Sequence, residues 1–174
     1  IILCTIMGLH LDFYYAICDA MILAERNRKE TIKMDLLDRK NVRILEKADD
    51  WKDAIRKSVM PLEEEGYVKA EYKEAIISGV EKLGPYIIVA PSIALPHARP
   101  EQGVIKSQIA ITLFRQEVQF EKKDSAAQLF VALAASDSDS HVEALMTISE
   151  ILQDEEKVKQ ILQSENAETL YSFF

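Results

Sequence analysis

Two segments decide the expected fold of this chain: SQIAITLF (residues 107–114) and LFVALAA (residues 129–135). Both are apolar at consecutive positions, which is typical of strands that are buried on both faces of a sheet. Such a sheet needs helices on each side to cover it. We therefore expect these two segments to lie at the centre of a layered α/β domain.

Further short strands are predicted on either side of this centre. Residues 42–48 (VRILEKA) alternate apolar and polar side chains, as a half-buried strand does. Residues 86–90 (YIIVA) and 93–95 are short and rich in β-branched side chains, and residues 118–120 are expected to form a small edge strand. Periodicity alone does not give the order of the strands.

Helices are predicted on both sides of the strand region. Asp49 and Asp50 are suitable caps for a helix whose apolar face recurs at helical spacing and which Gly66 ends. A second such face, stopped by Gly84 and Pro85, comprises Tyr72, Ala75, Ile76, Val80 and Leu83. From Ser140 onward the pattern is helical again, with one face formed by Val142, Leu145, Met146 and Ser149, followed by Val158, Ile161 and Leu162.

The first part of the chain differs from the rest. Residues 1–33 are expected to form an appended helix or linker, and the domain proper to comprise residues 34–174. The apolar start of this segment is not predicted to cross a membrane, because Asp12 and Asp19 would each cost about 2.5–3.5 kcal/mol near a bilayer centre. No basic region or cleavage site indicates a signal peptide.

Composition narrows the functional classes. The chain has 174 residues, and its 21 Lys and Arg against 29 Asp and Glu give a net charge of -8, which argues against a nucleic-acid partner. Cys4 and Cys18 lack the spacing of a metal site and do not suggest a disulfide framework. We therefore expect a cytoplasmic protein with no metal.

His97 is the first candidate for chemistry. It lies in ALPHARP (residues 94–100), where two prolines fix the backbone and predict a stiff, exposed loop. Imidazole is a good nitrogen nucleophile near neutral pH, and Arg99, two residues on, would point to the same side and suit phosphate oxygens. The alternative is an ordinary turn with a solvated His and Arg.

His141 is the second candidate. Ser140 and Glu143 fit a capping box that opens a helix, which would place His141 in the first helical turn. The positive end of a helix and its free N–H groups favour an anion there. The alternative is a surface residue beside a cap. If the fold brings the two loops together, His97 accepts a phosphoryl group beside a helix N-terminus.

Other sites have less support. His10 lies among apolar residues and is expected to be packed rather than reactive. The sequence has no Walker loop, no GxGxxG after a strand, no HExxH and no GxSxG. The acidic run at residues 63–65 is better explained as a solvated helix end.

Three segments carry a resemblance to a known family: GPYIIVAPSIALPHARPEQGV (residues 84–104), LFVALAASDSDSHVEAL (residues 129–145) and DLLDRKNVRILEKADDWKDAIRKS (residues 35–58). The chain resembles enzyme IIA of the bacterial sugar phosphotransferase system, in its mannitol and fructose family and specifically the ascorbate-type branch. The resemblance implies a single-domain α/β sandwich with a mixed sheet flanked by helices over residues 34–174.

The resemblance also implies a phosphoryl relay. The small protein HPr would pass its phosphoryl group to His97, which would hand it to a cysteine of enzyme IIB, with His141 in the same site and no cofactor. Association with the membrane would be indirect, through the enzyme IIC permease. A phosphorylation-sensing module of a transcriptional regulator, and an interaction domain with inert histidines, are the alternative hypotheses.

One departure from the family concerns the phosphate site. Relatives often carry an arginine in the helix after Tyr72, where this sequence has ISGV (residues 77–80). Arg99 is the candidate for the replacement charge, and Ser140 is a second candidate for phosphate binding. Because a relay serves two partners in turn, we also expect a shallow site, rimmed by Ile93, Ala94 and Ala98.

Overall fold

A mixed five-stranded sheet forms the centre of the protein in this computed structural model, which describes residues 36–121 and 125–174. The strand order is β1-β4-β5-β3-β2. The central pair β4 and β5 is antiparallel, β1 and β3 pair parallel to β4 and β5 respectively, and β2 closes the sheet antiparallel to β3. The strands are β1 (Leu37–Leu45), β2 (Ile88–Ala90), β3 (Ser92–Ala94), β4 (Gln108–Gln119) and β5 (Ala126–Ala134).

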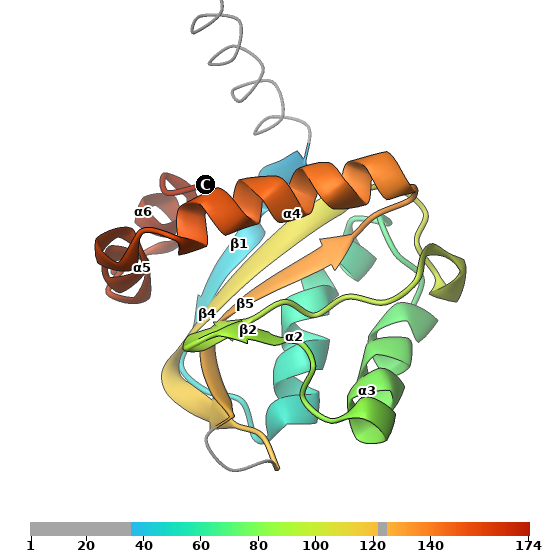
Figure 1. Cartoon of the computed structure of the whole chain (residues 1–174), viewed down its shortest axis with the longest axis horizontal. Coiled ribbons are helices and arrows are strands. Elements are labelled where there is room, and N and C mark those ends of the chain that lie inside the picture. Colours follow the sequence, from blue (N-terminus) through green and yellow to red (C-terminus); the bar gives the residue numbers. More distant parts are fainter. Residues whose placement is uncertain (1–35, 122–124) are drawn as a thin grey trace, which may run out of the picture. The chain divides into compact units, whose positions relative to one another are not determined.

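Helices cover both faces of this sheet, as predicted (Figure 1). One face is covered by α2 (Trp51–Glu64) and α3 (Glu71–Leu83). The other is covered by α4 (Ser138–Leu152), α5 (Glu155–Leu162) and α6 (Ala167–Tyr171). A short 3-10 helix, η1 (Pro100–Gln102), follows β3. The predicted α/β sandwich with a mixed sheet is therefore confirmed.

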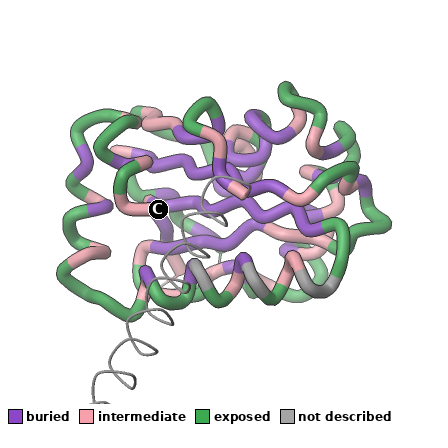
Figure 2. Tube along the Cα trace, turned by 90° about the horizontal axis from the view of Figure 1, so that it is seen from above, coloured by how far each residue is buried: buried purple, intermediate pink, exposed green. Residues whose placement is uncertain are grey.

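The alternation of side chains along the central strands gives the protein two separate cores. Phe130, Ala132 and Ala134 of β5 belong to the core under α2 and α3. Leu129, Val131 and Leu133 belong to the core under α4. Figure 2 shows the buried residues concentrated along the strands between the helices. Consecutive apolar residues thus serve both faces of one strand, as predicted.

The start of α2 and the end of α3 lie where the sequence signals predict them. Asp50 is the N-cap of α2, and its carboxylate accepts a hydrogen bond from the Asp53 N–H (2.8 Å). The predicted apolar face of α2 is buried. α3 ends at Gly84, which adopts a φ of 79°, a left-handed conformation that favours glycine. Leu83 is the exception on the predicted face of α3, because its side chain is 76% exposed.

The strand bounds differ from the prediction by one to five residues at most ends, and two differences are larger in consequence. β1 begins at Leu37 rather than Val42 and ends at Leu45. The predicted small edge strand at residues 118–120 is wrong: Val118 and Gln119 are the end of β4, and they pair with β5 after a register shift. A bulge of this kind interrupts the ladder but not the strand, so the sequence pattern is broken while the pairing resumes.

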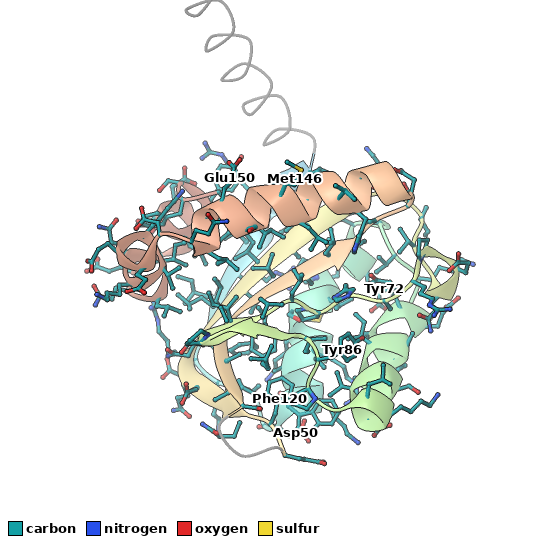
Figure 3. The ribbon with its side chains drawn as sticks, viewed as in Figure 1. Asp50, Tyr72, Tyr86, Phe120, Met146 and Glu150 are labelled. Carbon is teal, nitrogen blue, oxygen red and sulfur yellow. The ribbon has the colours of Figure 1, made fainter. Side chains whose placement is uncertain are left out.

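The prediction for the buried face of α4 needs a correction. The predicted apolar face is wrong, because Val142 and Met146 are 54% and 62% exposed, and the buried residues are Ala144, Ile148 and Ile151. Figure 3 shows Met146 on the outer side of α4. Apolar residues lie on both sides of this helix, so its periodicity does not identify the buried side by itself.

Part of the sequence interpretation lies outside the described residues. This holds for the predicted helix over residues 1–33 and for His10, Cys4 and Cys18. Within residues 36–121 and 125–174, no helix combines the length and the apolar composition that a membrane crossing requires.

Candidate functional site

The segment that carries His97 is fixed to the sheet by its backbone. The Leu95 N–H donates to the Ile87 carbonyl (2.7 Å), and the Leu133 N–H donates to the Pro96 carbonyl (3.0 Å). His97 itself forms a parallel bridge with Leu133 of β5. The predicted stiff loop after the strand is therefore a continuation of the β3–β5 ladder, and its stiffness comes from these hydrogen bonds as well as from the prolines.

The His97 ring has one nitrogen engaged and one without a partner among the described residues. Its Nδ1 lies 2.8 Å from the Leu95 carbonyl oxygen. A carbonyl oxygen only accepts, so Nδ1 must carry the proton and donate it. In the neutral ring the lone pair is then on Nε2. The side chain is half-buried, so the ring is neither sealed in the core nor fully solvated.

Tyr72 of α3 fastens the His97 segment from the core side. Its side chain is fully buried, its hydroxyl accepts from the Ala98 N–H (3.1 Å), and it donates to the Leu133 carbonyl (2.7 Å). Burial disfavours the phenolate and raises the pKa of Tyr72 to about 12. The hydroxyl therefore remains a donor at every physiological pH, and one side chain connects α3, β5 and the residue after His97.

Tyr86 contacts His97 directly, and the sequence interpretation missed it. Its hydroxyl donates to the His97 carbonyl (3.1 Å), and its ring lies edge-on to the imidazole at 5.7 Å between centroids. Partial burial raises the pKa of this phenol as well. The available signal was the position of Tyr86 directly after the Gly84–Pro85 stop, but that position does not reveal a contact with a residue 11 positions away.

The start of α4 is organised by Asp137 rather than by Ser140. Asp137 is the N-cap: its carboxylate accepts from the Ser140 N–H (2.8 Å) and from the Ser140 hydroxyl (2.5 Å). The predicted cap at Ser140 is therefore wrong, because an aspartate three residues earlier makes the capping bond first. His141 is the fourth helical residue, and its N–H donates to the Asp137 carbonyl (3.2 Å).

The fold brings the two histidines together. The ring centroids of His97 and His141 lie 6.0 Å apart, with 48° between the ring planes. One ring comes from the continuation of β3 and the other from the first turns of α4. The condition that the sequence could not supply, proximity of the two segments, is thus met in the structure.

Both rings line an open cavity of about 740 Å³. Arg99 and Lys82 supply positive charge to its lining, and Asp137 supplies a carboxylate. Ser140 is not part of the lining. The full lining is Ala75, Ser78, Gly79, Lys82, Leu83, Tyr86, His97, Ala98, Arg99, Pro100, Gln102, Ala135, Asp137, His141 and Val142.

The rim of the cavity differs from the prediction. Ile93 and Ala94 are buried in the two cores and are therefore not rim residues, whereas Ala98 does line the cavity. The exposed apolar side chains at the site are larger: Leu83, Tyr86 and Val142. Alternation along β3 directs its side chains into the cores, so the rim is built by the helices instead.

The two cationic side chains of the cavity are available to an anion. No ion pair between described residues involves Arg99 or Lys82. In the part of the chain that the structure describes, no three His, Cys, Asp or Glu side chains gather as metal ligands would. The arrangement offers an imidazole nitrogen with a free lone pair in a cavity that two cationic side chains, Arg99 and Lys82, also line.

Comparisons with known proteins identify the family to which this chain is related. Residues 35–174 match the family described as "Phosphoenolpyruvate-dependent sugar phosphotransferase system, EIIA 2". The mannitol-specific cryptic phosphotransferase enzyme IIA component of Escherichia coli is 36% identical over 136 residues, which are 78% of this chain and 92% of the relative. The ascorbate-specific EIIA component of the same species is 32% identical over 127 residues, 72% of this chain and 82% of the relative.

Solved structures of related proteins have the same fold. The solution structure of the mannitol-specific cryptic enzyme IIA from Escherichia coli superposes with a TM-score of 0.75 at 34% identity, covering 82% of this chain and 96% of that chain. A complex of mannitol enzyme IIA with phosphorylated enzyme IIB, also from Escherichia coli, shares the fold at 23% identity and a TM-score of 0.66, covering 76% and 93%. The chain belongs to the EIIA 2 family of the phosphoenolpyruvate-dependent sugar phosphotransferase system, and it is an enzyme IIA phosphotransferase component, a phosphocarrier for sugar uptake.

Proposed function

We propose that His97 carries the phosphoryl group and that Nε2 is the nitrogen that binds it. The observation that supports this is the hydrogen bond from Nδ1 to the Leu95 carbonyl, which leaves the Nε2 lone pair as the nucleophile. The lone pair attacks the phosphorus of phospho-HPr, and the new N–P bond forms as the N–P bond of the donor histidine breaks. No proton has to leave Nε2, and the positive charge of the phosphorylated ring is shared with the Leu95 carbonyl dipole.

The second transfer reverses the first with a different acceptor. A cysteine thiolate of enzyme IIB attacks the same phosphorus, the S–P bond forms, and the bond to Nε2 breaks. The protein contributes alignment and charge stabilisation to both steps. We assign the charge stabilisation to Arg99, whose guanidinium suits two phosphoryl oxygens, and to His141, whose ring lies beside that of His97.

Ser140 remains a second candidate for the phosphoryl oxygens. Its N–H and its hydroxyl are both bonded to Asp137, so it would have to exchange one of these bonds to bind phosphate. We therefore expect Ser140→Ala to slow transfer less than Arg99→Ala.

The surroundings of the cavity support two protein partners, HPr and enzyme IIB. Leu83 and Val142 are 76% and 54% exposed beside His97 and His141, and Arg99 and Lys82 add positive charge. An apolar rim with few charges is the usual composition of an interface centre. The mannitol enzyme IIA solved with phosphorylated enzyme IIB has the same fold. We place this relay in the cytoplasm, with the membrane reached only through the enzyme IIC permease.

The transported sugar is proposed to be ascorbate or a related acid. Relatives named for mannitol and for ascorbate match at similar identity, 36% and 32%. Because enzyme IIA contacts other proteins and not the sugar, the choice of enzyme IIB is the relevant measurement. Phosphorylated protein should transfer label faster to an ascorbate-type enzyme IIB than to a mannitol-type one, and the reverse order would reassign the sugar.

One experiment tests the carrier role. The protein is incubated with enzyme I, HPr and labelled phosphoenolpyruvate, and uptake of acid-labile, base-stable label is compared with that of His97→Ala. Wild type should be labelled and His97→Ala should not, whereas His141→Ala should still be labelled, more slowly. Unlabelled wild type would end the proposal, and labelled His97→Ala would move the acceptor to another residue.

A further inference from the structure

Tyr86 and Gly79 form a pair beside His97 to which neither the sequence nor the comparisons assign a role. The Leu95 carbonyl, the His141 ring and the Tyr86 ring all lie against the His97 ring. We propose that Tyr86 is a positioning residue, which holds the His97 imidazole in its phosphoryl-accepting orientation, and that Gly79 supplies the space which the tyrosine needs. This inference rests on the proposed role of His97.

The position of Tyr86 is well fixed by its own backbone. Its N–H donates to the Gly84 carbonyl (2.7 Å), and the next residue, Ile87, is fully buried and accepts the bond from Leu95. The side chain lies on the α3 side of the strand that leads to His97, near Tyr72 (Figure 3). The Tyr86 side chain is therefore anchored beside His97 and is not a mobile surface tyrosine.

Gly79 leaves room for the Tyr86 ring. It lies inside α3, and a Cβ at this position would be 2.9 Å from the Tyr86 hydroxyl oxygen and 3.4 Å from its Cε1. Real Cβ atoms do not approach so closely, so an alanine would displace the ring. Glycine destabilises a helix interior relative to alanine, and close approach of the tyrosine is a physical reason for its presence.

The position of the Tyr86 ring affects the orientation of the His97 imidazole. Rotation of an imidazole about its last side-chain torsion is soft, and the single bond from Nδ1 to Leu95 fixes the tautomer more firmly than the tilt of the ring. In-line transfer requires the attacking nitrogen to be aligned with the phosphorus and the leaving atom. The Tyr86 ring blocks rotation toward α3, and its hydroxyl holds the His97 carbonyl.

The test must separate ring positioning from partner docking, because Tyr86 is also 39% exposed at the rim. Phosphoramidate is a small phosphoryl donor that needs no docking surface. With phosphoramidate, Tyr86→Leu should be labelled about 10-fold more slowly than wild type, and Tyr86→Phe, which keeps the ring, within about 3-fold. Tyr67→Leu, at a tyrosine outside the cavity, should label at the wild-type rate.

Gly79 is tested in two backgrounds. Gly79→Ala alone should slow labelling about as much as Tyr86→Leu, and it should add little to Tyr86→Leu, because the clash partner is then gone. Proton NOEs between the His97 and His141 rings should be the same in wild type and Tyr86→Phe and weaker in Tyr86→Leu, whereas nitrogen-15 spectra should show the same Nδ1-protonated tautomer in all three, because the bond to Leu95 remains. A merely structural loss would not be rescued by phenylalanine in this way.

The outcomes separate the two proposals. Normal phosphoramidate labelling of Tyr86→Leu with slow labelling from phospho-HPr would make Tyr86 a docking residue and overturn the positioning role. Additive effects of Gly79→Ala and Tyr86→Leu would overturn the role of Gly79. Persistent labelling of His97→Ala would instead remove the proposed acceptor, whatever the Tyr86 variants do.

Discussion

The two histidines of the cavity are held in different ways. The His97 segment is tied to its surroundings by backbone bonds to Ile87 and Leu133, and its ring by Leu95. His141 is held only through its position on α4, and no described residue hydrogen-bonds to its ring. This difference fits the proposed roles, in which a fixed acceptor, His97, lies beside a more adaptable neighbour, His141, and the phosphoryl group arrives and departs with different partners.

Among variants that keep the proposed acceptor, the largest expected effect comes from the adaptable histidine, His141. His141→Ala should slow label transfer from phospho-HPr by roughly 100-fold, since removal of one charge-stabilising group in a transfer site typically costs this much. Rapid-quench measurement of labelling gives the rate. The control is the free energy of unfolding in urea, which should stay near the wild-type value. An unchanged rate would show that His141 takes no part in the transfer.

Tyr72, which holds the His97 segment, predicts that the free energy of unfolding depends on pH. Burial raises the pKa of Tyr72 from about 10 to about 12, so the folded protein keeps this proton longer than the unfolded chain does. The stability contribution is complete below pH 10 and is lost as the pH rises toward 12, by roughly 2–3 kcal/mol. The urea-unfolding free energy of wild type, measured against Tyr72→Phe from pH 9 to 12, should converge on that of the variant.

The same hydroxyl can be removed at neutral pH. Tyr72→Phe leaves the Leu133 carbonyl and the Ala98 N–H without their partner, and we expect a loss of about 2 kcal/mol in the free energy of unfolding. The matched control is Tyr67→Phe, at a tyrosine with no such pair of bonds among the described residues. Equal stability of the two variants would show that the Tyr72 hydroxyl does not hold the His97 segment.

The smallest expected effect concerns the start of α4. Asp137→Ala removes the cap that accepts from Ser140, at a cost of about 1 kcal/mol. Asp154→Ala removes the equivalent cap of α5, which accepts from Lys157 (3.0 Å), and should cost the same. Only Asp137→Ala should also slow labelling, because only that helix carries His141. Equal labelling rates would show that the reaction does not depend on how α4 begins.

Much of this arrangement was predictable from short-range patterns. Consecutive apolar residues predict the central strands. Two prolines predict the stiff segment that carries His97, and a helix start predicts that His141 lies in a first helical turn. Tyr72 could not be found in this way, because its bond to Leu133 joins residues 61 positions apart. The start of α4 was misplaced for a simpler reason: Asp137 and Ser140 both have capping side chains, and only the coordinates show which one accepts the bond.

Only one nitrogen of the His97 ring, Nε2, has no hydrogen-bond partner among the described residues. In the proposed relay, the incoming and the outgoing transfer both use that one atom within one cavity, so the donor and the acceptor protein bind the same face and exclude each other. The rate of phosphoryl transfer from donor to acceptor should therefore be highest at an intermediate concentration of each partner. It should fall when either is in large excess, because a bound partner prevents the other from binding.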